Sequence, residues 1–329
     1  KGGEMQRFKH ILVVVDLTQS SNLALVRAVN LAQNNQASLT VVSVVPKMTA
    51  GIGMPKGGPI SDDLQSYAIA SANKALDEAI RPFVSLIQIK TLVLVGIPFL
   101  EIIKEVLRNK HDLVIKSPEN ISWLDRMFGS DDMHLLRKCP CPVWLVKPST
   151  SHTYRRILAA IDVDLDHPPD EIALRHKLNI QILEMAVSLS LSDFAELHVI
   201  SAWQAIGESV IDNPFISHSE ARVDEYIEQT RRSFDSGLTK LINEVKNKNN
   251  ENLGEFLNPQ KHLIKGLPQK EIPILANNLK VDLVVMGTVA RTGIPGFFIG
   301  NTAETILSQI KCSVLAIKPS EFVSPVTLD

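Results

Sequence analysis

Short, continuous apolar runs rich in β-branched residues recur along the chain, and longer amphipathic stretches separate them. In the first half, the apolar runs predict strands at 11–15, 39–45, 89–95, 113–115 and 143–146. The stretches between them predict helices at 23–32, 63–86, 99–108 and 131–137. Runs without polar alternation indicate strands that are buried on both faces, as in a parallel sheet covered by helices. The predicted order of elements is therefore βαβαβαβαβ.

The second half of the chain repeats this order. Its predicted strands lie at 157–161, 196–202, 261–265, 283–286 and 314–317, and its helices at 179–190, 219–248, 268–279 and 302–309. Gly96-Ile97-Pro98 is matched 170 residues later by Gly266-Leu267-Pro268, and the closing segments CPVWLVKP and CSVLAIKP also correspond. A period this long is a whole domain. We therefore expect a tandem duplication, with domains at 1–149 and 154–320 and a tail at 321–329.

Each copy is predicted to be an α/β domain, an open, twisted, five-stranded parallel sheet with helices on both faces. Ligands of such sheets bind beyond the carboxyl ends of the strands, where the strand order reverses. Asp16 and Asp162 follow the first strand of their copies, so both are expected at that edge. Irregular inserts at 48–59, 164–177 and 204–218 are expected to be solvated loops or lids.

The two copies are expected to form an intramolecular pseudo-dimer. The linker at 148–153 is short, and the fifth strand of each copy is a natural edge strand. An uncovered strand edge tends to pair with another. Further dimerisation between chains is left open.

Composition narrows the possible partners. The 329 residues suit two domains of about 150 residues. The net charge of the chain is −2. Residues 1–149 hold 17 basic and 13 acidic residues, a charge of +4, and the remainder has a charge of −6. Neither half has the strong positive charge of a nucleic-acid-binding domain, so a nucleic-acid partner is not expected. No apolar run approaches the roughly 20 residues of a membrane-spanning helix. The polar start and the three cysteines suit a protein of the reducing cytoplasm.

A glycine-rich loop follows the fourth strand of the second copy, from Gly287 to Gly300, and leads into a helix. Glycine lets the backbone approach a ligand closely, and the N–H groups of a helix start favour an anion. Asn301 and Glu304 fit a capping box that would fix this start. The loop predicts a phosphate site, and the alternative is a glycine-rich turn with a capped helix and no ligand.

The repeated βαβαβαβαβ order, the aspartate after the first strand and this loop resemble the universal stress protein family over essentially the whole chain. Members of that family that bind ATP carry the motif G-x2-G-x9-G-[ST]. The second copy has Gly287, Ala290, Gly300 and Asn301 at the four motif positions. Ala290 and Asn301 depart from the motif, although Ala290 still offers an N–H group and Asn301 a side-chain donor.

The resemblance implies a role for individual residues of the second copy. Asp162 would lie near the ribose, Val199 beside the base, and Met286 against adenine. The phosphates would be held by the backbone of Gly287, Ala290, Gly300, Asn301 and Thr302. Arg291 would add a charge contact to phosphate, or lie in solvent.

The first copy departs from the motif in a way that predicts a degenerate site. Gly129-Ser130 keeps the last motif pair, but Pro118 lacks an N–H donor and Glu119 adds a negative charge. Asp131 and Asp132 occupy the helix start, where carboxylates stabilise the helix and repel a second anion. This site is expected to be empty or to hold another ligand, such as an acyl group or a nucleotide sugar.

Two classes of function follow. The first is a stress-response protein that binds ATP or a related adenine nucleotide, with or without Mg²⁺, in its second domain and regulates unknown protein partners through ligand-dependent surfaces. The second is a non-nucleotide ligand-binding or scaffold protein that acts through the pseudo-dimer surface. The sequence has no Walker A lysine motif and no catalytic constellation or metal-ligand set at recognisable spacing. An enzyme is therefore not favoured, and slow ATP hydrolysis stays open.

Overall fold

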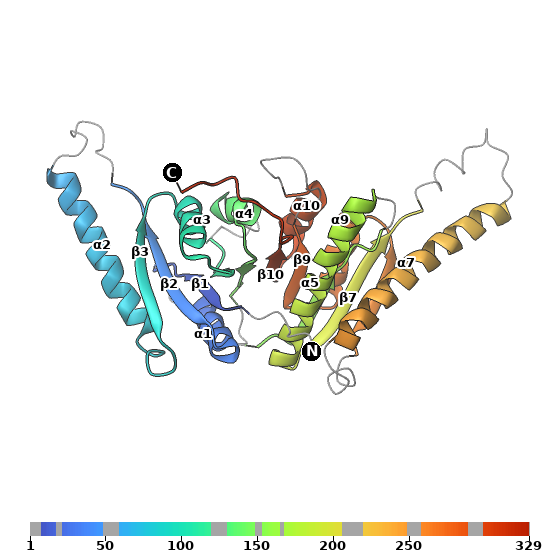
Figure 1. Ribbon diagram of the computed structural model, residues 1–329, viewed down its shortest axis with the longest axis horizontal. Coiled ribbons are helices and arrows are strands. Elements are labelled where there is room, and N and C mark those ends of the chain that lie inside the picture. The colour runs from blue at the N-terminus through green and yellow to red at the C-terminus, as the bar shows by residue number, and fades with distance from the viewer. Residues whose placement is uncertain are drawn as a thin grey trace. The chain divides into compact units, whose positions relative to one another are not determined.

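The computed structural model describes residues 8–17, 22–48, 59–119, 130–148, 153–164, 168–205, 220–248, 258–288 and 299–328. They form two compact units, each with strands and helices in alternation (Figure 1). The N-terminal unit comprises the described residues of Arg7–His152, Gly293–Ile299 and Ser313–Asp329. The C-terminal unit comprises those of Thr153–Thr292 and Gly300–Cys312. The α/β fold class predicted from the apolar runs is confirmed.

The N-terminal unit is built on a parallel sheet with the strand order β3-β2-β1-β4-β5. Its parallel strands are β1 (His10–Val14), β2 (Ser38–Val45), β3 (Ile89–Val95), β4 (Leu113–Lys116) and β5 (Val143–Leu145). Its helices are α1 (Leu23–Asn35), α2 (Pro59–Ile80), α3 (Pro98–Asn109) and α4 (Ser130–Lys138). Leu12, Val13 and Ile115 are fully buried, which explains why the central strands read as continuous apolar runs.

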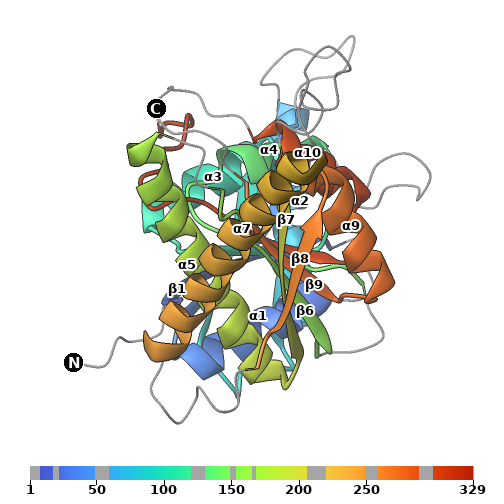
Figure 2. The same ribbon diagram turned by 90° about the vertical axis from the view of Figure 1, so that its right-hand side faces the viewer.

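The C-terminal unit repeats this arrangement with the strand order β8-β7-β6-β9, again parallel. Its strands are β6 (Arg156–Ala160), β7 (Glu196–Trp203), β8 (Gln260–Lys265) and β9 (Leu283–Gly287). Its helices are α5 (Pro169–Asp193), α7 (Glu220–Lys248), α9 (Pro268–Asn278) and α10 (Asn301–Gln309). Helix α5 packs against α7, and α9 packs against α10 (Figure 2). None of the helices in the described ranges is long and apolar enough to cross a membrane.

The last strand, β10 (Ser313–Ile317), belongs to the N-terminal unit although it closes the second repeat in the sequence. It pairs antiparallel with β5, with Val314 opposite Leu145 and Leu315 opposite Trp144. The edge strand of one copy is therefore covered by the edge strand of the other, as the repeat predicted. Two tandem copies joined in this way fit an intramolecular pseudo-dimer.

The Gly-x-Pro motif shared by the copies has the same structural role in both. Gly96 and Gly266 end β3 and β8 with φ of 146° and 150°, a conformation that residues with a side chain rarely adopt. A Cβ on either glycine would lie 2.8 or 2.6 Å from the Cγ atom of Glu101 or Glu271 in the following helix. The proline then occupies the first turn of α3 or α9, where no N–H donor is needed.

The aspartate that precedes the fourth strand of each copy joins that strand to the first. Asp112 accepts hydrogen bonds from the N–H groups of Lys9-His10 at 2.6 and 3.0 Å. Asp282 accepts the equivalent bonds from Arg155-Arg156 at 2.7 and 3.0 Å. The two copies therefore share this aspartate because it holds the first and fourth strands together.

Two local predictions were wrong. The insert at 164–177 was expected to be irregular, but α5 begins at Pro169 and covers most of it. Proline is favoured in the first turn of a helix, so the pair Pro168-Pro169 marks a helix start. The capping box of Asn301 and Glu304 is also absent. The N-cap of α10 is Gly300, no side chain caps it, and Asn301 is already helical.

A histidine pair links β7 and β8 and predicts a pH dependence of stability. Nδ1 of His198 lies 3.0 Å from Nε2 of His262, and the His198 ring is almost fully buried. Burial lowers the pKa of both histidines. The carboxylate of Glu196 lies 3.7 Å from Nε2 of His198 and partly opposes the lowering of the His198 pKa. The charge of a protonated His198 lowers the pKa of His262 further. The unfolded chain therefore binds more protons than the folded chain below about pH 6.5.

We expect the free energy of unfolding to fall as the pH is lowered from 7 towards 5. Replacing both His198 and His262 by Gln should make this fall shallower, because the unfolded variant no longer gains those protons. Urea unfolding at a series of pH values measures the slope. His176→Gln, at a half-exposed position on α5, is the control. An unchanged slope in the double variant would show that the pair does not cause the effect.

Candidate functional site

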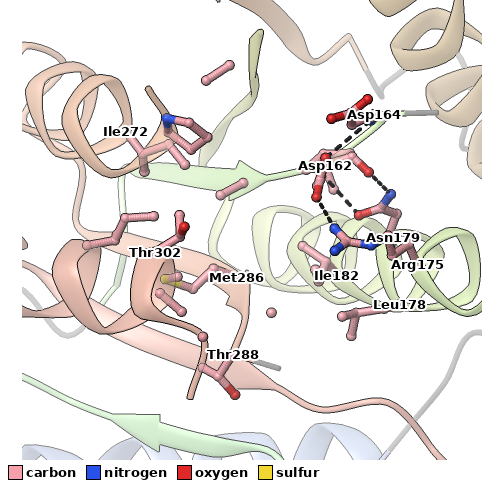
Figure 3. Close-up of a pocket in the computed structure, with 18 of the residues that line it drawn as sticks. Asp162, Asp164, Arg175, Leu178, Asn179, Ile182, Ile272, Met286, Thr288 and Thr302 are labelled. Atoms are coloured by element: carbon pink, nitrogen blue, oxygen red, sulfur yellow. Dashed lines mark hydrogen bonds and ion pairs between the residues drawn. The ribbon is translucent and has the colours of Figure 1, made fainter. Parts of the chain in front are cut away.

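A cavity of about 340 Å³ opens in the C-terminal unit at the carboxyl ends of β6, β7 and β9. Helices α5, α9 and α10 supply most of the remaining lining (Figure 3), and Phe234 of α7 also contributes. The chain passes from β6 to β7 on one side and returns to β9 on the other, so the strand order reverses at β6. This is where ligands of open α/β sheets bind.

One side of the cavity is a polar cluster around Asp162, which follows β6 (Figure 3). Its carboxylate forms an ion pair with the guanidinium of Arg175 on α5 and accepts a hydrogen bond from the N–H group of Asp164 at 3.2 Å. The side-chain amide of Asn179 donates to the backbone carbonyl of Asp162 at 2.6 Å and accepts from its N–H group at 3.3 Å. Helix α5 therefore fixes the backbone of Asp162, while half of its side chain remains exposed.

The other side is largely apolar and comes from β9, α9 and α10. Met286, Thr302 and Ile272 lie across the cavity from Asp162 (Figure 3). Gly287 also lines the cavity, and a Cβ there would lie 2.8 Å from Cδ2 of Leu178 on α5. Glycine at this position therefore lets α5 approach the end of β9, which is a packing reason independent of any ligand.

The start of α10 offers hydrogen-bond donors to the cavity. The N–H group of Gly300 is already used, since it donates to the carbonyl of Thr288 at 3.1 Å. The first helical bond runs from Glu304 N–H to Gly300 C=O at 3.0 Å, so the preceding N–H groups have no acceptor within the helix. Two of them belong to the lining residues Thr302 and Ala303. The helix dipole makes this end attractive to an anion.

Thr288 adds a second polar group to the same side. Its hydroxyl oxygen is buried and has no hydrogen-bond partner among the described residues. A buried polar atom without a partner is costly, and such atoms in native proteins usually have one. The Thr288 hydroxyl is therefore a polar group of the lining with which a ligand could pair.

The structure brings together five of the nine binding residues predicted from the sequence. These lining residues are Asp162, Met286, Gly287, Gly300 and Thr302. Asn301 is exposed in the first turn of α10 and is not part of the lining. Val199 is fully buried inside β7, whereas the lining from this strand begins at Ala202. Ala290 and Arg291 lie outside the described residues, as do most of the inserts at 48–59 and 204–218.

The sequence analysis missed the contribution of α5 because it began this helix at 179 and placed the first turns of α5 in an irregular insert. Arg175, Leu178, Asn179 and Ile182 line the cavity at spacings of three and four residues, which is one face of a helix. That spacing was the available signal. Trp203, at the end of β7, also lines the cavity and has its ring centroid 6.4 Å from that of Phe234 on α7.

The N-terminal unit has an internal ion pair at the equivalent place. Lys116 ends β4 opposite Val14, as Met286 lies opposite Ala160 in the other copy. Its Nζ atom lies 2.5 Å from Oδ1 of Asp132, in the first turn of α4, and Asp132 is fully buried. After the loop the repeat offset is 171, as between Gly129 and Gly300, so Asp132 aligns with Ala303, which lines the cavity of the C-terminal unit.

The same carboxylate organises the loop that follows β4. Asp132 Oδ2 accepts a hydrogen bond from the N–H group of Glu119 at 2.8 Å. Burial raises the pKa of Glu119, and the carboxylate of Asp132 raises it further, while Lys116 acts in the opposite direction. Both oxygens of Asp132 thus have partners within the protein. Asp132 fills this place and is neutralised by Lys116. The sequence had suggested that its carboxylate stabilises the helix and repels a second anion.

The sequence profile of the Universal stress protein family matches residues 7–147 and 153–318. The chain belongs to the universal stress protein family, with two such domains in tandem. It is similar to Universal stress protein E of Escherichia coli (strain K12), with 32% identity over 99% of this chain and 98% of the relative. A crystal structure titled as a putative universal stress protein from Pseudomonas aeruginosa is 28% identical, with a TM-score of 0.65 over 97% of this chain and 96% of that one. The family resemblance found in the sequence is therefore confirmed.

Proposed function

We propose that this stress-response protein binds one adenine nucleotide, ATP in the first instance, in the cavity of its C-terminal unit. The observation that carries the proposal is the arrangement of the cavity. A carboxylate at the end of β6 faces the start of α10 across a largely apolar surface, at the point where the strand order reverses. The bound nucleotide would act by changing the surfaces that regulatory protein partners contact.

Each part of a nucleotide has a chemically suitable place in this cavity. The half-exposed carboxylate of Asp162 can accept hydrogen bonds from ribose hydroxyl groups. Met286 and Ile272 provide apolar surface for a base. The first turn of α10 and the Thr288 hydroxyl suit phosphate oxygens. The volume of about 340 Å³ is at the lower end of the usual range for small-molecule sites.

A universal stress protein has been crystallised in complex with cAMP. Its structural likeness to this chain is weak, so the proposal rests on the cavity itself. The alternative is a non-nucleotide ligand or a scaffold role, for which the apolar part of the lining would be the binding surface.

Analysis of the ligand that copurifies with the full chain distinguishes these possibilities. The purified protein is denatured with acid, and the released small molecules are identified by liquid chromatography and mass spectrometry, with and without Mg²⁺ during purification. We expect ATP or another adenine nucleotide at up to one molecule per chain. Addition of ATP should also raise the melting temperature of protein from which ligand has been removed. Recovery of an apolar compound, together with no thermal shift by ATP, ADP or AMP, would contradict the proposal.

A further inference from the structure

Two cysteine thiols touch one another in the N-terminal unit, between α4 and β5. The Sγ atoms of Cys139 and Cys141 are 3.6 Å apart. Cys139 is completely buried and Cys141 is 8% exposed. We call these two residues the dithiol pair. The third cysteine of the chain, Cys312, is partly exposed.

A buried lysine accompanies the dithiol pair. Lys318 follows β10, and its Nζ atom donates hydrogen bonds to the carbonyl groups of Leu136 and Arg137 in the last turn of α4, at 2.6 and 3.2 Å. The ring of Phe322 lies 4.4 Å from the same ammonium group. Lys318 thus places a positive charge at the end of α4, beside Cys139, and only 5% of the residue is exposed.

The surroundings make the two thiols unequal. Burial opposes ionisation of Cys139, but its hydrogen bond with Cys141 and the charge of Lys318 outweigh burial, so the pKa of Cys139 is lowered. Burial raises the pKa of Cys141 well above the usual range, and Cys139 raises it further. Burial also lowers the pKa of Lys318 to about 8, against the opposing influence of the two thiols. One thiol is therefore suited to attack as a thiolate, and its neighbour retains its proton.

We propose that the dithiol pair is a peroxide-reactive site that forms an intramolecular disulfide between Cys139 and Cys141. The contact between the sulfur atoms carries the inference, because closing a bond of about 2.05 Å from this separation requires an approach of only about 1.5 Å. The ammonium group of Lys318 supplies the positive surroundings that reactive cysteines share.

The reaction balances with hydrogen peroxide as the oxidant. The Cys139 thiolate attacks one peroxide oxygen, the O–O bond breaks, and the hydroxide released takes a proton to become water. Cys141 then attacks Sγ of the Cys139 sulfenic acid, the S–O bond breaks, and a second water leaves with the Cys141 proton. Two thiols lose two electrons in total, and one peroxide molecule gains them.

Burial predicts which oxidants reach the site. Hydrogen peroxide is close to water in size, so a small local opening is enough for it to enter. Glutathione disulfide is far larger, and only 8% of Cys141 is exposed to it. Glutathione disulfide should therefore modify the partly exposed Cys312 before the dithiol pair. This difference separates a selective site from general thiol oxidation.

The test is thiol counting and intact mass spectrometry on the folded full-length chain treated with hydrogen peroxide near neutral pH. The Cys312→Ser variant isolates the dithiol pair. We expect both of its thiols to disappear with a mass loss of about 2 Da, restored by dithiothreitol, and peptide mapping should locate the link between Cys139 and Cys141. Cys141→Ser should instead accumulate sulfenic or sulfinic acid at Cys139.

Lys318 gives a second, independent readout. Lys318→Met should slow disulfide formation on the order of tenfold and move its pH profile to higher pH, because the Cys139 thiolate is then less populated. Lys318→Arg, which keeps the charge, should retain most of the rate. Thiols that stay reduced in the folded Cys312→Ser chain but react with peroxide in urea would overturn the proposal, as would sulfinic acid formation without a disulfide.

Discussion

Replacing Met286 by Lys and Ala303 by Asp in the same chain should abolish adenine-nucleotide binding by the C-terminal unit. These are the residues that occupy the equivalent positions in the N-terminal unit, where they form a buried ion pair at 2.5 Å. In the C-terminal unit the longer side chains would fill part of the cavity, and the new carboxylate would stand at the helix start that suits phosphate. The new pair would occupy space that the nucleotide needs, and its carboxylate would take the place of a phosphate at the helix start, so we expect affinity to fall at least about 100-fold.

The repeat supplies a matched control for this experiment. The reverse exchange, Lys116→Met with Asp132→Ala, changes the same two positions in the N-terminal unit and should leave nucleotide affinity unchanged. Met286→Leu tests whether bulk alone matters and should weaken binding only slightly. Binding is measured by calorimetry, with circular dichroism as a check of the fold. A folded M286K/A303D variant that binds as tightly as the natural chain would contradict the assignment of the site.

Asp132→Ala alone should lower the free energy of unfolding by about 3–5 kcal/mol, the usual loss when one partner of a buried ion pair is removed. The Lys116 ammonium group, with 12% of its side chain exposed, would lose the carboxylate that neutralises it, and the Glu119 N–H group would lose its acceptor. Lys116→Met combined with Asp132→Ala removes both charges and reproduces the Met/Ala pair of the other copy. This double variant leaves no unpaired charge, so it should lose only about 1–3 kcal/mol, the cost of the Glu119 N–H group without its acceptor.

A double-mutant cycle on urea unfolding measures the coupling between the two side chains. Asp131→Ala is the control, since its neighbouring and less buried carboxylate should contribute about 0.3–1 kcal/mol through the helix dipole. Additive losses from Lys116→Met and Asp132→Ala, with no recovery in the double variant, would show that the ion pair does not stabilise this place in the fold.

The sequence predicted the elements of the fold well because two signals agreed. Continuous β-branched runs identified the strands, and the repeat allowed each element to be checked against its counterpart. The pairing of β5 with β10 was also predictable, since both are edge strands of a duplicated sheet. The start of helix α5 was the exception, because Pro168-Pro169 was taken as a loop signal although proline also starts helices.

The site could be predicted only as far as local sequence determines it. Asp162, Met286 and Gly300 stand at strand ends or at a helix start, so a motif locates them. Arg175 lines the cavity because α5 packs beside it, and the glycine-rich motif at 287–301 contains no information about that packing. The pairing of Lys116 with Asp132 joins residues 16 apart and depends on how α4 meets β4. A direct comparison of the copies, Lys116 with Met286 and Asp132 with Ala303, would have indicated it.

The most direct test of the central claim is the number of nucleotide molecules bound per chain. Isothermal titration calorimetry of ligand-free, full-length protein with ATP should give one site per chain, and the M286K/A303D variant should give none. One site is expected because the cavity lies in the C-terminal unit and an internal ion pair fills its counterpart. Two equal sites, or no binding of any adenine nucleotide by the natural chain, would contradict the account.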